Sequence, residues 1–255
     1  MTVFCYHGVQ HDWTSPLNTE PDVFARQAAW ISRRRTVLPL VEAVGRMDRS
    51  GRLPRRLAAL TFDDGLENLV HHALPVLIRY RLPATVFVVA ETLTPQGRPV
   101  DWIDTPPPYP LTTLTRDQVL QMAEAGVDFQ SHSWSHLDLT TLDHGTCVRD
   151  LRDSRELLED LLGRPVPHLA YPRGRNDAGV RRAAAAAGYT HAFTLPEGPE
   201  PVDAHGLPRV GVYQGNSMTS LAVKAQRPYL LVRTHPAFPA ARGAVRGVRS
   251  LAGRG

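Results

Sequence analysis

The sequence has few cysteines, no long apolar run and no cluster in which basic and aromatic residues alternate. Its two cysteines, Cys5 and Cys147, stand far apart among 255 residues, which excludes a disulfide scaffold and is compatible with a reducing compartment. No apolar stretch approaches the roughly 20 residues that cross a membrane. The net charge of +4 is spread along the chain, which favours a solvated basic face over nucleic-acid binding. The first residues lack the pattern of a signal peptide, so we expect a cytoplasmic protein.

Segments typical of strands alternate with segments typical of helices along the whole chain. The run 84–90 is apolar and β-branched, as in a strand buried on both faces of a parallel sheet. The alternation predicts an α/β sheet or barrel, with one domain over 1–239 and a mobile Arg/Gly-rich tail over 240–255. Strands are expected over 2–7, 36–40, 57–62, 84–90, 127–131, 168–171, 189–195, 209–213 and 229–234. Helices are expected over 20–35, 41–47, 67–80 (interrupted at Pro75), 115–125, 146–162 and 176–187, the last capped by Asn176.

The expected strand 57–62 ends in two adjacent carboxylates and a glycine, Asp63-Asp64-Gly65. Neighbouring side chains on a regular strand point to opposite faces, but a turn at Gly65 would let both carboxylates face one cavity. One carboxylate could then hold a metal ion while the other accepts a proton. The alternative is that Asp63 or Asp64 merely caps the helix that follows.

Polar residues directly follow four of the expected strands. They are Asp63-Asp64 after 57–62, His132 and His136 after 127–131, Pro172-Arg173-Gly174 after 168–171, and His235 after 229–234. Because parallel α/β folds build their sites at the carboxyl ends of strands, we expect these residues to share one site.

The histidines at 132 and 136 are separated by four positions, a spacing that places both imidazoles on one face of a helical turn. Two histidines and one strand-end aspartate would leave positions open for water and substrate. That is the pattern of catalytic rather than structural metal sites. The lack of a paired-cysteine motif also argues against structural zinc.

Two of these segments resemble the sequence motifs of a known protein family. Thr61-Phe62-Asp63-Asp64-Gly65 and His132-Ser133-Trp134-Ser135-His136 resemble the first two motifs of the polysaccharide deacetylase family, also called NodB-homology or carbohydrate esterase family 4 proteins. Looser similarities cover Tyr6-His7-Gly8-Val9, Ala170-Tyr171-Pro172-Arg173-Gly174, Leu207-Pro208-Arg209-Val210 and Leu231-Val232-Arg233-Thr234-His235, so that the resemblance extends from residue 2 to about residue 236. It implies a distorted, TIM-like (β/α)7/8 barrel and metal-dependent removal of N-acetyl groups from an amino sugar, oligosaccharide or polysaccharide.

The resemblance also implies a role for each motif residue. Asp63 corresponds to the general base, and Asp64, His132 and His136 to ligands of a divalent metal, with zinc expected and Co²⁺, Ni²⁺ or Mn²⁺ as alternatives. His235 corresponds to the general acid, and the backbone N–H of Arg173 to the donor for the oxyanion. Candidate substrate-binding residues are Tyr171, Pro172, Trp134, Arg209 and His7. For His7 a core position is favoured over the pocket, and for Trp134 packing is as plausible as stacking on a sugar.

The sequence departs from the family pattern in three places. Ala170 stands where many members have an arginine that orients the base, so Arg173, Arg175 or Arg209 supplies that charge or Asp63 goes without it. No tryptophan occurs between 195 and 209, and Arg233-Thr234 precede the last histidine. Two alternatives therefore stay open: a hydrolase of a non-sugar amide or secondary metabolite, and an inactive carbohydrate-binding homologue. The expected partner is an N-acetylated carbohydrate or small molecule.

Overall fold

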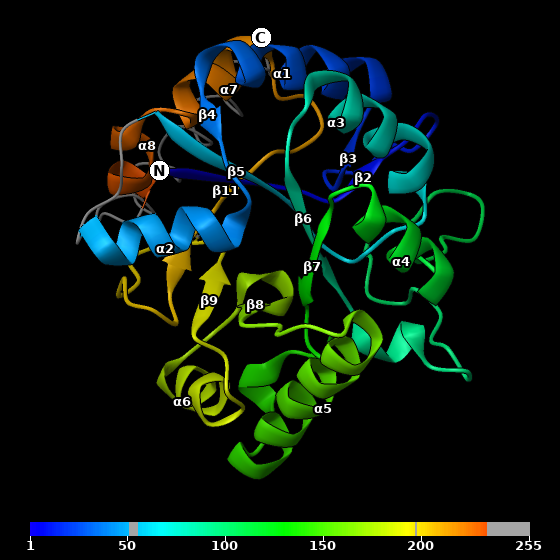
Figure 1. Cartoon of the computed structure of the whole chain (residues 1–255), viewed down its shortest axis with the longest axis vertical. Helices are drawn as coiled ribbons and strands as arrows, with labels where there is room; N and C mark the ends of the chain where they lie inside the picture. Colours follow the sequence, from blue (N-terminus) through cyan, green and yellow to red (C-terminus); the bar gives the residue numbers. More distant parts are fainter. Residues whose placement is uncertain (51–55, 197, 234–255) are drawn as a thin grey trace, which may run out of the picture.

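The computed structural model describes residues 1–50, 56–196 and 198–233, and it consists of parallel strands surrounded by helices (Figure 1). The strands are β1 (Thr2–Tyr6), β2 (Gly8–Val9), β3 (Asn18–Thr19), β4 (Thr36–Val37), β5 (Leu57–Phe62), β6 (Ala84–Val88), β7 (Asp128–Ser131), β8 (His168–Ala170), β9 (His191–Thr194), β10 (Leu207–Pro208) and β11 (Val210–Gly211). The helices are α1 (Pro21–Arg34), α2 (Leu40–Ser50), α3 (Leu74–Tyr80), α4 (Arg116–Glu124), α5 (His144–Leu162), α6 (Ala178–Ala186), α7 (Met218–Lys224) and α8 (Arg227–Arg233). A π-helix, η1 (Leu69–Ala73), and three 3₁₀ helices, η2 (Ala90–Leu93), η3 (Leu139–Thr141) and η4 (Pro172–Gly174), complete the described elements.

The strands form a barrel. Eight of them follow one another in the order β10-β9-β8-β7-β6-β5-β1-β11, and every pairing is parallel. β10 pairs with β9 and β11 pairs with β1, so the segment 207–211, with Arg209 at its centre, bridges the two edges of the sheet. The predicted (β/α)7/8 barrel is confirmed.

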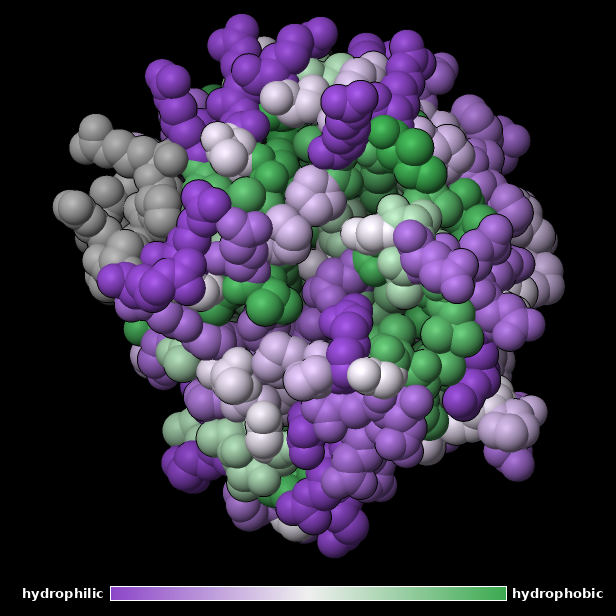
Figure 2. Space-filling view, viewed as in Figure 1, coloured by the Kyte–Doolittle hydropathy of each residue, from purple (hydrophilic) through white to green (hydrophobic). Residues whose placement is uncertain are grey.

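The strands are buried on both faces because alternate side chains point inwards and outwards. Phe4, Leu60 and Val86 pack outwards in one apolar cluster with side chains of the surrounding helices. Phe87 of β6 and Phe193 of β9 meet in a second cluster, and since they come from separated strands they fill the barrel interior. On the face seen in Figure 2, hydrophilic side chains cover most of the periphery and hydrophobic ones lie in the hollows between them.

Most expected helices are present, with the caps that their sequences provide. Thr115 and Gln118 form a capping box at the start of α4. The interrupted helix 67–80 is η1 followed by α3, with Pro75 in the first turn of α3, where its missing N–H does no harm. The cap of α6 is Asp177 rather than Asn176, since the Asp177 carboxylate accepts the N–H of Val180.

The expected strand 229–234 is wrong, because residues 227–233 form α8. Pro228 stands in the first turn of this helix, where proline is favoured, and the apolar run after it is too short to distinguish a strand from a helix by periodicity. His235 and the expected tail 240–255 lie outside the described residues. Of the helices that are described, none has the length and apolar character needed to cross a membrane.

Two loops interlock above the barrel. Trp13 Nε1 donates to the carbonyl oxygen of Thr105 at 2.7 Å, and the hydroxyls of Ser15 and Thr105 are 2.6 Å apart. The long irregular segment after η2 is therefore fixed to the loop that follows β2.

His168, at the start of β8, is a buried and neutral histidine. Its ring packs edge-on against His191 and Phe193, and its Nδ1 has no hydrogen-bond partner among the described residues. Burial, reinforced by the charge of His191 when that ring is protonated, lowers the pKa of His168 to about 3. The folded protein therefore excludes a proton that the unfolded chain accepts at about pH 6.5.

We expect acid to destabilise the fold through His168. The contribution of His168 to the free energy of unfolding is fully present above pH 6.5. It is lost as the pH falls towards 3, by about 1.4 kcal/mol for each pH unit. Urea unfolding between pH 6 and pH 4.5 should show a shallower pH dependence for His168→Phe than for the wild type. His144→Phe, at an exposed position in α5, is the control and should follow the wild type. Equal slopes for His168→Phe and the wild type would contradict this assignment.

Candidate active site and metal centre

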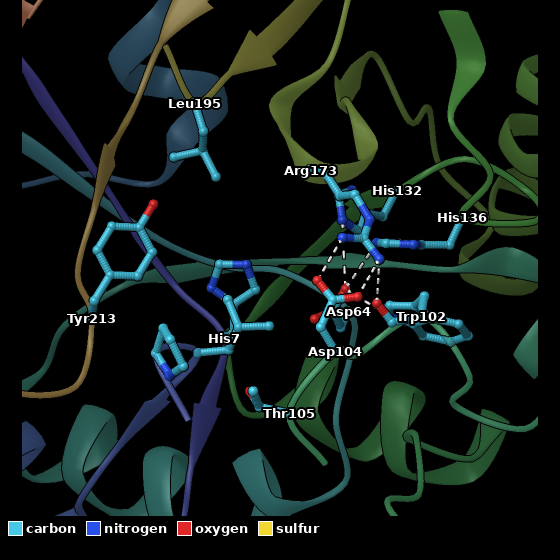
Figure 3. A pocket seen from close by; sticks show the side chains of 12 residues that line it. His7, Asp64, Trp102, Asp104, Thr105, His132, His136, Arg173, Leu195 and Tyr213 are labelled. Carbon is cyan, nitrogen blue, oxygen red and sulfur yellow. Dashed lines mark hydrogen bonds and ion pairs between the residues drawn. The ribbon is translucent and has the colours of Figure 1, made fainter. Parts of the chain in front are cut away.

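A cavity of about 330 Å³ lies at the carboxyl ends of the barrel strands (Figure 3). Six of its residues directly follow or closely follow six different strands of the barrel: His7, Asp64, His132, Arg173, Leu195 and Tyr213. The remaining lining comes from the two interlocked loops and from His136. Polar residues that follow separate strands thus do meet at one edge of the barrel.

The two aspartates face different partners because the backbone turns between them. The N–H of Asp63 still donates to the carbonyl oxygen of Tyr6 as part of the sheet, whereas Asp64 and Gly65 have φ values of 70° and 63°. A Cβ atom at Gly65 would lie 2.7 Å from Val88 Cγ1, so this turn requires glycine. Neither aspartate caps the next helix, since Asn68 occupies the N-cap position of η1.

His132 and His136 converge by a different route from the expected helical turn. Ser133 and His136 have φ values of 69° and 54°, which are not helical. Serine hydroxyls hold the turn: Ser131 Oγ accepts the N–H of Ser133, and Ser133 Oγ accepts the N–H of His136. The serines of the motif thus replace helical hydrogen bonds, and the expectation of a helix is corrected.

Asp64, His132 and His136 form a compact cluster of potential metal ligands. Asp64 Oδ1 lies 3.6 Å from His132 Nε2 and 3.3 Å from His136 Nε2. Ligands about 2.0–2.1 Å from a tetrahedral ion are separated by roughly 3.3 Å, so the three atoms are spaced as a divalent ion requires. His132 Nδ1 donates to the carbonyl oxygen of Ala170 at 2.8 Å, which leaves Nε2 as the free lone pair. The donor set therefore fits a divalent metal.

The charges of the cluster also suit ligation. Burial lowers the pKa of His132 to about 4, so its imidazole is neutral at pH 7. Burial opposes ionisation of Asp64, but the hydrogen bond and charge of His136 outweigh it and bring the pKa of Asp64 to about 2. A neutral imidazole and an ionised carboxylate are the forms that bind metal.

Asp63 is paired with Arg209. Arg209 Nη1 and Nη2 donate to Asp63 Oδ1 and Oδ2 at 2.6 and 2.7 Å, and both side chains are buried. Burial would raise the pKa of Asp63, but the Arg209 guanidinium holds it well below its usual range. Of the three arginines considered for this role, Arg173 and Arg175 instead bind Asp104 and Asp138. Arg209, which was also a candidate for substrate binding, does not line the cavity.

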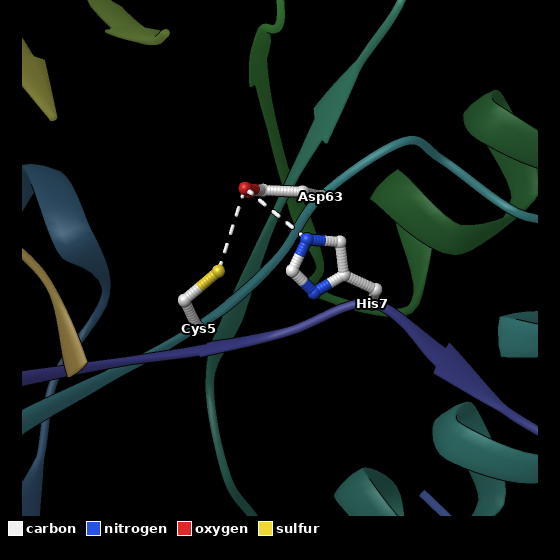
Figure 4. Close-up of side chains that lie close together, drawn as sticks. All are labelled: Cys5, His7 and Asp63. Carbon is white, nitrogen blue, oxygen red and sulfur yellow. Dashed lines mark hydrogen bonds and ion pairs between the residues drawn. The ribbon is translucent and has the colours of Figure 1, made fainter. Parts of the chain in front are cut away.

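Cys5, His7 and Asp63 form a second buried group with potential metal ligands (Figure 4). Cys5 Sγ lies 3.4 Å from Asp63 Oδ2, and His7 Nε2 lies 4.0 Å from the same oxygen. This group does not fit a metal, because Arg209 already occupies both carboxylate oxygens. Burial also raises the pKa of the Cys5 thiol well above its usual range, so the thiol stays protonated and donates to Asp63.

The other expected site residues divide into two groups. His7 and Arg173 line the cavity, and the Arg173 backbone takes a left-handed turn with φ of 57°. Tyr171, Pro172 and Trp134 do not line it. Tyr171 is buried, with its hydroxyl donating to the carbonyl oxygen of His205, and Trp134 is half-buried.

Trp102 is a site residue that the sequence did not indicate. Its indole lines the cavity, stacks on His136 and donates to Asp64. It lies in the long loop after η2, 38 residues from Asp64, and the only sequence signal was the length of that loop.

The fold and the site define an α/β barrel with a candidate mononuclear metal centre at the carboxyl ends of its strands. Comparison with known families then gives a specific assignment. Residues 50–192 match the polysaccharide deacetylase family, and the chain belongs to this family.

Individual relatives are distant. The Bacillus subtilis protein YxkH, whose name places it among the polysaccharide deacetylases, is 28% identical over 160 residues, which cover 62% of this chain and 52% of that protein. The poly-β-1,6-N-acetyl-D-glucosamine N-deacetylase of Staphylococcus epidermidis is 25% identical over 201 residues, which cover 73% of this chain and 65% of that enzyme. The chain thus spans between half and two thirds of the length of these curated relatives.

Solved structures share the fold. The Streptococcus pyogenes deacetylase PplD superposes with a TM-score of 0.76 at 24% identity, covering 89% of this chain and 98% of that one. IcaB from Ammonifex degensii superposes with a TM-score of 0.70 at 24% identity, covering 88% and 96%.

Proposed function

We propose that this protein is a metal-dependent hydrolase that removes N-acetyl groups from an amino sugar or its polymer. The observation that carries the proposal is that a cavity-lining cluster that fits a divalent ion, Asp64, His132 and His136, lies directly beside a buried carboxylate, Asp63, that is held by an arginine. Membership of the polysaccharide deacetylase family supports the same reaction.

Asp64, His132 and His136 would hold the ion, and their two nitrogens and one oxygen suit zinc. When bound, such an ion polarises an acetamide carbonyl and lowers the pKa of water towards about 7. Zinc is the ion that we propose, with other first-row divalent ions as outcomes of the test below.

Asp63 is proposed as the general base. Its two oxygens are fixed by the Arg209 fork, and Oδ2 lies 4.0 Å from His132 Nε2, beside the ligand cluster. A carboxylate so fixed can accept a proton from water without reorienting. The backbone N–H of Arg173, in the turn after β8, is proposed as a donor to the developing oxyanion.

For the proton that the leaving amine needs, we propose His7. It follows β1, lines the cavity, and its Nε2 lies 4.0 Å from Asp63 Oδ2. Imidazole is the usual side chain for this task. His235, which the family resemblance suggested for this role, lies outside the described residues.

The proposed substrate is an N-acetylglucosamine unit in a saccharide. Several relatives are poly-β-1,6-N-acetyl-D-glucosamine N-deacetylases by name, and a cavity of about 330 Å³ is at the small end of ligand pockets. A cytoplasmic location remains a prediction from the sequence.

The test is release of acetate from N-acetylglucosamine oligomers by the purified protein. We expect activity that is lost on chelation and restored by a divalent ion, with zinc, cobalt, nickel and manganese compared. Small non-sugar acetamides, assayed in parallel, should react at least tenfold more slowly. Undiminished activity after complete removal of metal would contradict the metal-dependent mechanism, and preferential turnover of the small amides would contradict the substrate.

A further inference from the structure

Trp102 touches two of the three candidate metal ligands, although it lies outside the motifs that contain them. Its Nε1 donates a hydrogen bond of 3.1 Å to Asp64 Oδ1. Its ring stacks on the imidazole of His136, with centroids 4.9 Å apart and planes inclined by 24° (Figure 3). Trp102 is buried, with 8% of its surface exposed at the cavity wall.

The hydrogen bond reaches the oxygen that faces the other ligands. Asp64 Oδ1 is the atom 3.6 Å from His132 Nε2 and 3.3 Å from His136 Nε2. The backbone of Asp64 has φ of 70°, a left-handed conformation that is uncommon for residues other than glycine. An indole N–H on the same oxygen restrains a carboxylate that stands on a strained turn.

His136 lacks the support that a ligating histidine normally has. A metal-binding imidazole usually donates its second N–H to a carbonyl or carboxylate, which fixes its tautomer and orientation. His132 has that bond, to the carbonyl oxygen of Ala170. His136 Nδ1 is buried and has no hydrogen-bond partner among the described residues. The His132 ring meets the ring of His136 only edge-on, with centroids 5.0 Å apart, so the stacked indole is the contact that covers its face.

The loop that carries Trp102 is itself held in place. Arg173 Nη2 donates to the carbonyl oxygen of Trp102 at 2.8 Å, and its guanidinium binds both oxygens of Asp104 at 2.9 and 3.1 Å. The guanidinium of Arg98 lies over the indole, 5.7 Å from its centroid. These contacts keep the indole on the ligands instead of leaving its position to a free loop.

We propose that Trp102 is a positioning residue for the metal centre: its N–H orients Asp64, and its ring holds His136 in place of the absent hydrogen bond. The inference rests on the proposed metal-dependent function, because it presumes that Asp64 and His136 bind an ion. The loop between η2 and α4, which carries Trp102, would thereby contribute to the affinity of the site for the ion.

Two substitutions separate the roles of the N–H and the ring. Trp102→Phe keeps an aromatic ring but removes the donor, and Trp102→Ala removes both. Zinc affinity is measured by competition with a chromophoric chelator. We expect it to fall about tenfold in Trp102→Phe and about a hundredfold in Trp102→Ala, the range found when outer contacts of metal ligands are removed. The matched control is Trp134→Phe, between the two histidines in sequence but outside the cavity lining, which should stay within twofold of the wild type.

Fluorescence tests separately whether Trp102 lies beside the bound ion. Cobalt binding should quench emission from Trp102, which is in contact with a ligand, and Trp102→Phe should lose most of this quenching. Trp30→Phe, in α1, should retain it. Thermal unfolding of the metal-free proteins verifies that Trp102→Phe is folded. If Trp102→Phe kept the zinc affinity and the cobalt quenching of the wild type, the inference about Trp102 would be overturned but the proposed function would not. A wild-type protein that binds no divalent ion would overturn the proposed function as well.

Discussion

Arg209→Met should lower the free energy of unfolding by about 3–5 kcal/mol and abolish activity. The substitution leaves the Asp63 carboxylate buried without a countercharge, and breaking a buried ion pair from one side has this cost. The pKa of Asp63, now held low chiefly by Arg209, should rise, because the largest influence that opposes burial is then removed. Denaturant unfolding at pH 7 measures the stability, and acetate release measures the activity.

Two further variants test whether the loss of stability in Arg209→Met comes from the broken Asp63–Arg209 ion pair. Arg175→Met removes an arginine whose bond to Asp138 is equally short, 2.6 Å, but whose side chain is 59% exposed. It should change stability by less than about 1 kcal/mol. The double variant Arg209→Met/Asp63→Leu removes both charges and should regain most of the stability without activity. An Arg209→Met protein as stable as Arg175→Met would disprove a dominant role for the pair.

The second large effect concerns the different roles proposed for the adjacent aspartates, Asp63 as general base and Asp64 as metal ligand. Asp63→Asn should still bind one divalent ion per chain but release acetate about 10²–10⁴-fold more slowly, the usual contribution of a general base. Asp64→Asn, the same chemical change one residue later, should lose the ion, because Asp64 supplies the only carboxylate of the described cluster. Metal analysis after dialysis distinguishes the two variants.

Histidine variants extend the same comparison. His7→Phe should behave like Asp63→Asn, with metal retained and activity lost, if His7 protonates the leaving amine. His235→Phe should then keep most of its activity. Loss of metal from Asp63→Asn, or full activity in His7→Phe, would require the roles to be reassigned.

The sequence predicted the site best where its residues are neighbours in the chain. Asp63 and Asp64 follow β5 directly, and both histidines follow β7 within five positions, so strand assignment alone brought them to one end of the barrel. The Asp63–Arg209 pair joins residues 146 positions apart, and the sequence could only name Arg209 as one of three candidates. Trp102 gave no signal beyond the length of its loop, because its importance lies in contacts that this loop makes in the folded protein.

Local geometry was harder to predict than the order of elements. The turn from His132 to His136 depends on serine hydroxyls that accept backbone N–H groups, which a spacing rule for helices does not represent. A strand was expected over 229–234 where α8 is found, because the four consecutive apolar residues 229–232 suit either structure.

The bridge formed by β10 and β11 closes the barrel and also carries Arg209, the partner of Asp63. Barrel closure and the Asp63–Arg209 pair therefore both depend on the register of the short segment 207–211. The ladder changes partner at Arg209: its N–H still donates to the carbonyl oxygen of Thr194 in β9, whereas the next residue, Val210, pairs with Phe4 of β1. Deleting or inserting one residue in this segment would turn the guanidinium to the outer face, since neighbouring strand positions alternate. Variation in the length of the loops on either side leaves this alternation intact. The flanking loops can therefore change in length, whereas the five residues 207–211 must keep their number for Arg209 to reach Asp63.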